Sequence, residues 1–304
     1  MSNLNWLASF AVAVAVIPAL TAETRCPGNV ESLPFRLVNR YQIIVAVYLN
    51  HSGPYNFLLD TGTQITLIDP SLATDLHLST QGSAEVAGVG FHSAATFAQL
   101  DLVEVGKRAV TNQKVLMYDL QHLEAAHQAV RGILGEDFLE HFDMLIDNAH
   151  SLLCLDDSDR MRADLKGPHI ALQRLAQGAN SSSLPEMLII SAHLSDGMRP
   201  VRLKLDSGTD TSFLYNTSEY MALAQPRGAS FLGRGAGGAQ RTFAALPPQD
   251  IRVGSVQFSR VPFVTFAGTR KDSRAVDFDG LLSLSQFRRI FICHSDHYAV
   301  LEPQ

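Results

Sequence analysis

The segment Tyr55-Asn-Phe-Leu-Leu-Asp60-Thr-Gly-Thr63 decides the fold, because a similar segment occurs again as Val201-Arg-Leu-Lys-Leu-Asp206-Ser-Gly-Thr209. Each segment begins as a run typical of a β-strand and ends in an aspartate, a hydroxyl residue and a glycine. Glycine lets the backbone turn sharply and lets two such turns approach each other closely. A segment repeated at long spacing predicts a chain built from two related units.

Two further landmarks follow each aspartate in the same order and at nearly the same spacing. Gly88-Val-Gly90 follows the first aspartate, and Gly233-Arg-Gly235 follows the second. Gly132-Ile-Leu-Gly135 comes later in the first unit, and Gly280-Leu-Leu-Ser283 takes its place in the second. We therefore interpret the chain as one unit written twice.

The join between the units is expected near residues 178–184, in a segment rich in Gly, Asn and Ser. The N-terminal unit would then span residues 23–178 and the C-terminal unit residues 179–304. A length of 304 residues agrees with two domains.

Each unit is predicted to be mainly antiparallel β-structure, so the fold class is all-β. Runs rich in β-branched and aromatic residues predict strands at residues 41–49, 98–105, 115–118, 256–264 and 289–293. Only short helices are expected, at residues 70–76, 137–142, 218–224 and 283–287.

The N-terminus carries an apolar run over residues 6–20, which is short for a helix that crosses a membrane. The run predicts a signal peptide over residues 1–22, cleaved after Ala22, and a secreted or periplasmic protein. Because no Lys or Arg precedes it, an uncleaved anchor or a buried core helix remains an alternative. Residues 23–40 are either a short pro-segment or a strand of a sheet between the units.

The three cysteines are too few for a disulfide scaffold and lack the paired spacing of a zinc ribbon. Export would place them in an oxidising compartment. The odd number leaves at least one of Cys26, Cys154 and Cys293 without an intramolecular partner. Simple burial is expected for Cys154 and Cys293, which lie in apolar runs.

Composition and the remaining motifs argue against nucleic-acid, nucleotide or metal binding. The net charge is −6, without a basic patch for nucleic acid. Residues 233–238 match G-x-G-x-x-G but lack the flanking strand and the later acidic residue of a dinucleotide site. His122 and His127 are too far apart for H-E-x-x-H, and His294 and His297 are expected to be solvated loop histidines. No cofactor and no metal are expected.

The two aspartates, Asp60 and Asp206, point to acid–base chemistry. Two carboxylates brought together cannot both ionise easily, so the pair shares one proton and titrates as a unit. One aspartate can then accept a proton from a water held between them, while the other donates to a carbonyl oxygen. Both are therefore candidate catalytic residues, with neither metal nor covalent intermediate.

The residues after each aspartate are expected to support the pair. Thr61 and Ser207 can brace one turn against the other, and Thr63 and Thr209 can donate to the outer carboxylate oxygens. Gly62 and Gly208 allow the close approach of the two turns.

These motifs resemble those of the retropepsin-like aspartic peptidases, and nearly the whole chain resembles a bacterial-style version with two such units fused. The resemblance implies two barrel-like β lobes related by a pseudo-twofold axis, with the active site between them. It implies a peptide or protein substrate under two glycine-rich flaps, formed by Gly88, Val89 and Gly90 and by Gly233, Arg234 and Gly235. Because one chain carries both aspartates, a monomer is expected.

The second unit departs from the family pattern at two positions. Ser283 replaces the second glycine of the Gly-Ile-Leu-Gly motif, and Asp210 stands where the first unit has Gln64. A further carboxylate facing the aspartates would raise their pKa values. Two functions are therefore expected as alternatives: an exported aspartic endopeptidase, and a catalytically weak or inactive module that binds a peptide or a cell-envelope component.

Overall fold

The computed structural model describes residues 25–304 except 89–90, 122, 126–127, 157, 174–183, 196–198, 216–229, 235–237, 239 and 268–277. The predicted signal peptide, the helix expected at 218–224 and most of the expected join lie outside the described residues. So do Val89, Gly90 and Gly235 of the expected flaps. The all-β expectation is confirmed, with short helices only.

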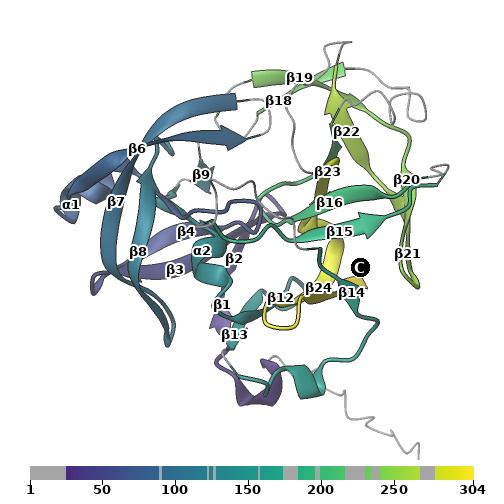
Figure 1. Cartoon of the computed structure of the whole chain (residues 1–304), viewed down its shortest axis with the longest axis horizontal. Coiled ribbons are helices and arrows are strands. Elements are labelled where there is room, and N and C mark those ends of the chain that lie inside the picture. Colours follow the sequence, from purple (N-terminus) through teal and green to yellow (C-terminus); the bar gives the residue numbers. More distant parts are fainter. Residues whose placement is uncertain are drawn as a thin grey trace, which may run out of the picture.

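The first sheet lies at the left of Figure 1 and contains eight strands in the order β2-β3-β4-β11-β5-β8-β7-β6. Strand β3 also pairs with β7, so the sheet folds back on itself. The bounds are β2 (Arg36–Val38), β3 (Gln42–Leu49), β4 (Ser52–Leu59), β5 (Leu67–Ile68), β6 (Thr80–Gly88), β7 (Phe91–Val105), β8 (Arg108–Met117) and β11 (Gly132–Leu134).

The second sheet, at the right of Figure 1, contains seven strands in the order β15-β16-β23-β17-β22-β19-β18. The bounds are β15 (Ile189–Ala192), β16 (Val201–Asp206), β17 (Ser212–Leu214), β18 (Ser230–Arg234), β19 (Gln240–Ala245), β22 (Phe263–Phe266) and β23 (Gly280–Ser283). Its pairings repeat those of the first sheet. β4–β11 and β16–β23 are parallel, β11–β5 and β23–β17 are antiparallel, and β5–β8 and β17–β22 are parallel.

A third sheet, here called the joining sheet, takes strands from both halves of the chain in the order β1-β13-β12-β24-β25-β14. It lies below the other two sheets in Figure 1. Strands β12 and β24 pair antiparallel, with Met144 opposite Ile292. The bounds are β1 (Leu33–Pro34), β12 (Asp143–Asp147), β13 (Leu152–Asp156), β14 (Ile170–Ala171), β24 (Phe287–Cys293) and β25 (Tyr298–Pro303). Of the two roles considered for residues 23–40, the structure has the strand, β1.

Several predicted elements change in extent. The strand expected at 256–264 is two strands, β21 (Val256–Val261) and β22, because Pro262 has no N–H for a ladder. Strand β21 pairs with β20 (Gln249–Val253) instead of joining the second sheet. A further short pair is β9 (Glu124–Ala125) with β10 (Gln128–Ala129).

The helices are short for local reasons. Helix α1 (Pro70–Asp75) begins where the Asp69 side chain accepts from the amide of Ser71 and Pro70 fixes the first turn. Helix α2 (Glu136–Leu139) starts one residue earlier and ends sooner than expected. The helix expected at 283–287 is a single 3-10 turn, Leu284–Gln286; other such turns are Pro27–Asn29 and Arg162–Asp164. Within the described residues, no helix is long and apolar enough to cross a membrane.

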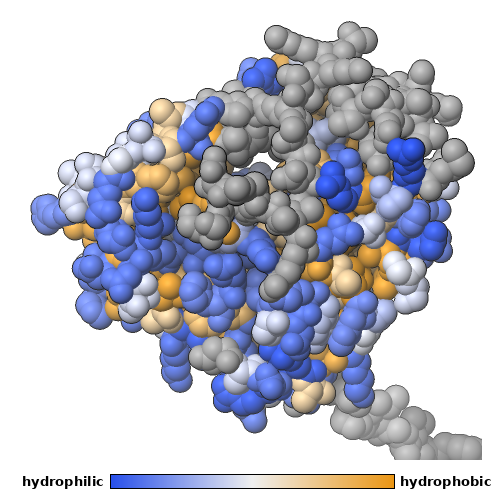
Figure 2. Space-filling view, in the orientation of Figure 1, coloured by the Kyte–Doolittle hydropathy of each residue, from blue (hydrophilic) through white to orange (hydrophobic). Residues whose placement is uncertain are grey.

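One apolar core connects the three sheets. Leu59 of the first sheet, Leu205 of the second and Ile290 of the joining sheet all belong to it and are fully buried. Figure 2 shows the opposite pattern on the outside, where blue hydrophilic residues cover much of the described surface. The strands that carry the two aspartates are therefore anchored in a shared, closely packed interior.

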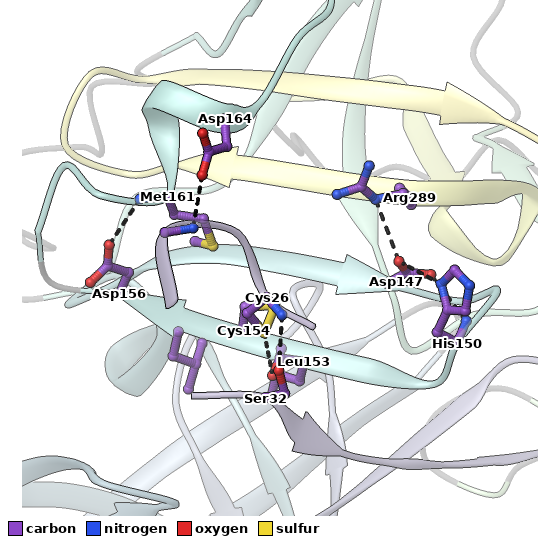
Figure 3. The surroundings of a disulfide bond; sticks show 12 residues. Cys26, Ser32, Asp147, His150, Leu153, Cys154, Asp156, Met161, Asp164 and Arg289 are labelled. Atoms are coloured by element: carbon purple, nitrogen blue, oxygen red, sulfur yellow. Dashed lines mark hydrogen bonds and ion pairs between the residues drawn. A yellow bond between two sulfur atoms is a disulfide. The ribbon is translucent and has the colours of Figure 1, made fainter. Parts of the chain in front are cut away.

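A disulfide between Cys26 and Cys154 ties the segment before β1 to strand β13 of the joining sheet (Figure 3). Cys154 is buried, as expected, but it is also bonded to Cys26, because the chain folds back and brings the two residues together, with a Cα–Cα distance of 5.8 Å. Cys293 is the free cysteine and is buried, as expected.

Candidate active site

Asp60 and Asp206 stand at corresponding ends of two strands. Asp60 follows β4, and its amide donates to the carbonyl of Leu134 in the neighbouring parallel strand β11. Asp206 is the last residue of β16 and lies opposite Ser283 of the parallel strand β23. Each aspartate is thus fixed between two strands of its own sheet.

The two turns meet through their glycines. A Cβ atom placed on Gly62 would lie 2.6 Å from the Cγ of Asp206. One placed on Gly208 would lie 2.5 Å from the Cγ of Asp60. Each carboxyl group therefore packs directly on the glycine of the opposite turn, where no other residue type fits.

Thr61 and Ser207 link the turns through buried hydrogen bonds that run in both directions. The Thr61 amide donates to the Ser207 hydroxyl, and the Ser207 amide donates to the Thr61 hydroxyl, both at 3.1 Å. The Thr61 hydroxyl donates to the Leu205 carbonyl at 3.1 Å, and the Ser207 hydroxyl to the Leu59 carbonyl at 2.9 Å. Each hydroxyl group thus bridges two backbone groups of the other half.

The partners of the two carboxylates differ. The Gly62 amide and the Thr63 hydroxyl each donate to Asp60, at 2.7 Å. The Gly208 amide donates to Asp206 at 2.8 Å. The expectation that Thr209 mirrors Thr63 was wrong, since its hydroxyl donates to the carbonyl of Thr211 at 3.1 Å.

The electrostatics of the pair follow from burial and proximity. Burial first, then the charge of Asp60, raises the pKa of Asp206 to about 7, while the ammonium of Lys204 acts in the opposite direction. A hydrogen bond with Asp60 favours the protonated form of Asp206 further. At mildly acidic pH the site therefore holds one proton between two carboxyl groups.

The departures of the second unit leave the pair intact. Gly135 packs against the Thr63 carbonyl, and at the corresponding place the Ser283 hydroxyl donates to the Thr209 carbonyl at 2.7 Å. Ser283 therefore replaces a close backbone contact with a hydrogen bond. Asp210 is exposed, and burial and the charge of Asp60 are the main causes of the raised pKa of Asp206.

The expected flaps coincide with two β-hairpins. Gly88 lies opposite Phe91 where β6 meets β7, and Arg234 lies opposite Gln240 where β18 meets β19. Both hairpins lie on the side of the molecule away from the joining sheet (Figure 1). Phe231 and Leu232 on β18 are 46% and 69% exposed, an apolar surface that sequence reasoning missed.

Sequence reasoning also missed two buried ionisable groups, Lys204 beside the pair and His294. Lys204 lies two residues before Asp206, and its ammonium group donates to the carbonyl of Gly62. The sequence signal was a basic residue on the same face of the strand as Asp206. His294 was expected to be a solvated loop histidine, which was wrong: its side chain is 8% exposed and Nε2 lies 3.0 Å from the buried Glu136. His297 is partly exposed.

The described residues contain no group of three or more His, Cys, Asp or Glu side chains that could hold a metal ion. The donors around Asp60 and Asp206 are amides, hydroxyls and an ammonium group. Such a set orients carboxylates and holds protons, and the arrangement suits acid–base chemistry on a water molecule.

Comparison with known proteins finds a family match within the first half of the chain. Residues 45–138 match the family model described as aspartyl protease. A retropepsin-like aspartic protease from Rickettsia conorii is among the solved structures similar to this chain, at 20% identity and a TM-score of 0.31, covering 41% of this chain and 90% of that one. No curated protein matches the chain significantly. The matched segment contains Asp60 and its turn, and this segment is similar to the aspartyl proteases.

Proposed function

We propose that the protein is an exported aspartic endopeptidase whose active site is formed by Asp60 and Asp206. The observation that carries this proposal is the mutual packing of each carboxyl group on the glycine of the opposite turn. The family match covers Asp60 but ends before the second half. The role of Asp206 therefore rests on the geometry of the pair.

In the proposed reaction, a water molecule lies between the two carboxyl groups. Asp60 accepts a proton from the water as its oxygen attacks the carbonyl carbon of the peptide bond. Protonated Asp206 donates its proton to the carbonyl oxygen, which gives a neutral tetrahedral diol. Return of a proton to Asp206 and transfer of one from Asp60 to the nitrogen break the C–N bond and release a carboxylic acid and an amine.

The substrate is proposed to be an extended peptide held between the two sheets and under the two hairpins. Extended peptides bind through backbone hydrogen bonds, and pockets for side chains add specificity. The repeated strand pairings of the two sheets support a pseudo-twofold arrangement of lobes. Since one chain supplies both aspartates, we propose that the monomer is the working unit.

Export is proposed from two features. The apolar run at residues 6–20 has the length of a signal-peptide core. The Cys26–Cys154 disulfide requires an oxidising compartment, and Cys26 would remain after cleavage behind Ala22. A secreted or periplasmic location follows from both.

A second candidate function is a peptide-binding module without turnover. The observation in its favour is the Thr209 hydroxyl, which bonds to Thr211 and leaves Asp206 without the donor that Thr63 gives Asp60. A less constrained Asp206 would weaken catalysis without removing the proposed peptide site between the two sheets.

The test compares Asp60→Asn and Asp206→Asn with Asp210→Asn, which removes an exposed carboxylate near the site. Cleavage of casein or a peptide library is measured across pH 3–8, together with binding of a statine-type transition-state mimic. We expect cleavage by the wild type and Asp210→Asn and at least a 1,000-fold loss in the other two. Retained cleavage in either active-site variant would contradict the assignment. Peptide binding without cleavage by the wild type would favour the binding module.

A further inference from the structure

Lys204 occupies an unusual place on strand β16. Side chains alternate along a strand, so Lys204 and Asp206 lie on the same face, while Leu203 and Leu205 point into the core. Two residues before Asp60, the first sheet has Leu58, a buried member of an apolar cluster. The corresponding position therefore holds a leucine in one half and a lysine in the other.

The lysine is buried and held from several sides. It is 7% exposed, and its ammonium group donates to the carbonyl of Gly62, across from its own sheet. The same ammonium lies 5.5 Å from the ring centroid of Phe278. Its strand neighbours are Ile189 on β15 and Leu281 on β23, both apolar.

A buried ammonium group is unfavourable unless negative charge compensates it. Three carboxylates act on Lys204 here, Asp206, Asp60 and Glu136. Burial lowers the pKa of Lys204, and these carboxylates raise it in return. Glu136 is itself paired with His294, which leaves the two aspartates as the groups whose charge the lysine chiefly balances.

We propose that Lys204 is a positioning residue of the aspartate pair, with two effects. Its hydrogen bond to the Gly62 carbonyl holds the turn of Asp60 against Asp206, and its positive charge stabilises the singly ionised pair. The proposal rests on the proposed function and adds a charge relationship that the first half of the chain lacks, since Leu58 is neutral.

The charge effect has a definite sign. A positive neighbour favours the ionised forms of both carboxyl groups, so removing it raises both macroscopic pKa values of the pair. In Lys204→Met, both limbs of the pH profile of kcat/KM should move to higher pH by about one unit or more. Lys204→Arg keeps the charge and should keep the profile near that of the wild type.

The matched control is Arg202→Met. Arg202 is on the same strand and the same face as Lys204, but it is half-exposed and near Asp279. Its removal also deletes one positive charge and should leave the profile in place. Equal shifts in both variants, or no shift in Lys204→Met, would overturn the proposal whatever happens to kcat.

A second readout separates this proposal from the proposed function. Titration of 13C-carboxyl-labelled aspartates, with Asp206→Asn to identify the signals, reports the pair directly in the wild type and in Lys204→Met. If the wild type cleaves nothing, the proposed function fails, yet an upward shift of these titrations still supports the role of Lys204.

If Lys204→Met does not fold, Lys204→Leu replaces it, since leucine is the residue at the corresponding position, Leu58, of the first half. In the wild type, the Lys204 Nζ signal must follow the titration of the pair, and must lose that step in Asp206→Asn. A Lys204 Nζ signal that does not change as the two aspartates titrate would overturn the proposal.

Discussion

The Thr61 amide donates to the hydroxyl of Ser207 while the Ser207 amide donates to the hydroxyl of Thr61, both over 3.1 Å and both buried. This pair of bonds closes the interface directly beneath the two aspartates. The two hydroxyl groups also donate to the carbonyls of Leu205 and Leu59, so losing one hydroxyl leaves two buried backbone groups of the opposite half unsatisfied.

Ser207→Ala should therefore lower the free energy of unfolding by about 2–4 kcal/mol, because it leaves the Thr61 amide and the Leu59 carbonyl without partners. Ser207→Thr, which copies the residue of the first turn, should keep most of the stability. Urea unfolding measures both, with the exposed Ser255→Ala as control. Equal stability of Ser207→Ala and the wild type would contradict the linking role of this serine.

Gly208→Ala should abolish cleavage, because its Cβ would lie 2.5 Å from the Cγ of Asp60 and force the two turns apart. The control is Gly254→Ala. Gly254 has a positive φ of 57° but open space around it. That variant should lose about 1 kcal/mol of stability and keep its kcat. A fully active Gly208→Ala protein would show that the turns do not pack as described.

His294 should make stability depend on pH. Burial alone would lower its pKa, but the hydrogen bond and charge of Glu136, with the Phe142 carbonyl, raise it above its ordinary value of 6.5. The charged pair therefore stabilises the fold fully below about pH 6.5. That stability is lost as the pH rises through the folded-state pKa.

The measurement is the urea midpoint between pH 5 and pH 9. We expect the urea midpoint of the wild type to decline at alkaline pH. In the double variant His294→Gln, Glu136→Gln, the midpoint should decline less. His77→Asn, at an exposed histidine, should decline as the wild type does. An identical decline of the midpoint in all three proteins would show that His294 does not cause the pH dependence of stability.

Cys26→Ala and Cys154→Ala should each lower the free energy of unfolding by about 3–5 kcal/mol, since the disulfide closes a loop across a sequence separation of 128. The double variant should lose no more than the larger single loss. Dithiothreitol should destabilise the wild type by a similar amount and leave the double variant unchanged. Insensitivity of the wild type to the reductant would argue against the bond.

The sequence predicted the all-β class and the residues that the structure brings together around Asp60 and Asp206, because turn chemistry and repetition are local signals. The mismatch at Thr209 could not be predicted, since the choice of Thr211 as its partner depends on the exact path of the turn. The Glu136–His294 pair joins residues far apart in the chain, and only the joining sheet brings them together.

The division of residues 256–264 into two strands is another feature that the sequence pattern could not predict. The pattern of apolar residues is continuous there, but Pro262 interrupts the ladder and sends the two pieces to different sheets. Lys204 follows the alternation of apolar and charged residues along its strand, which also contains Arg202, so the sequence did not single it out as buried. Its partner, the carbonyl of Gly62, belongs to the other half and could not be inferred from the strand itself.

The joining sheet also sets the order of events when the chain is made. Strand β12 must wait for β24, and β14 for β25, because these partners follow them far along the chain. Contacts between such distant segments form slowly, because the intervening loop must close first. The sheet that joins the two halves is thus complete only after β24 and β25 have been synthesised.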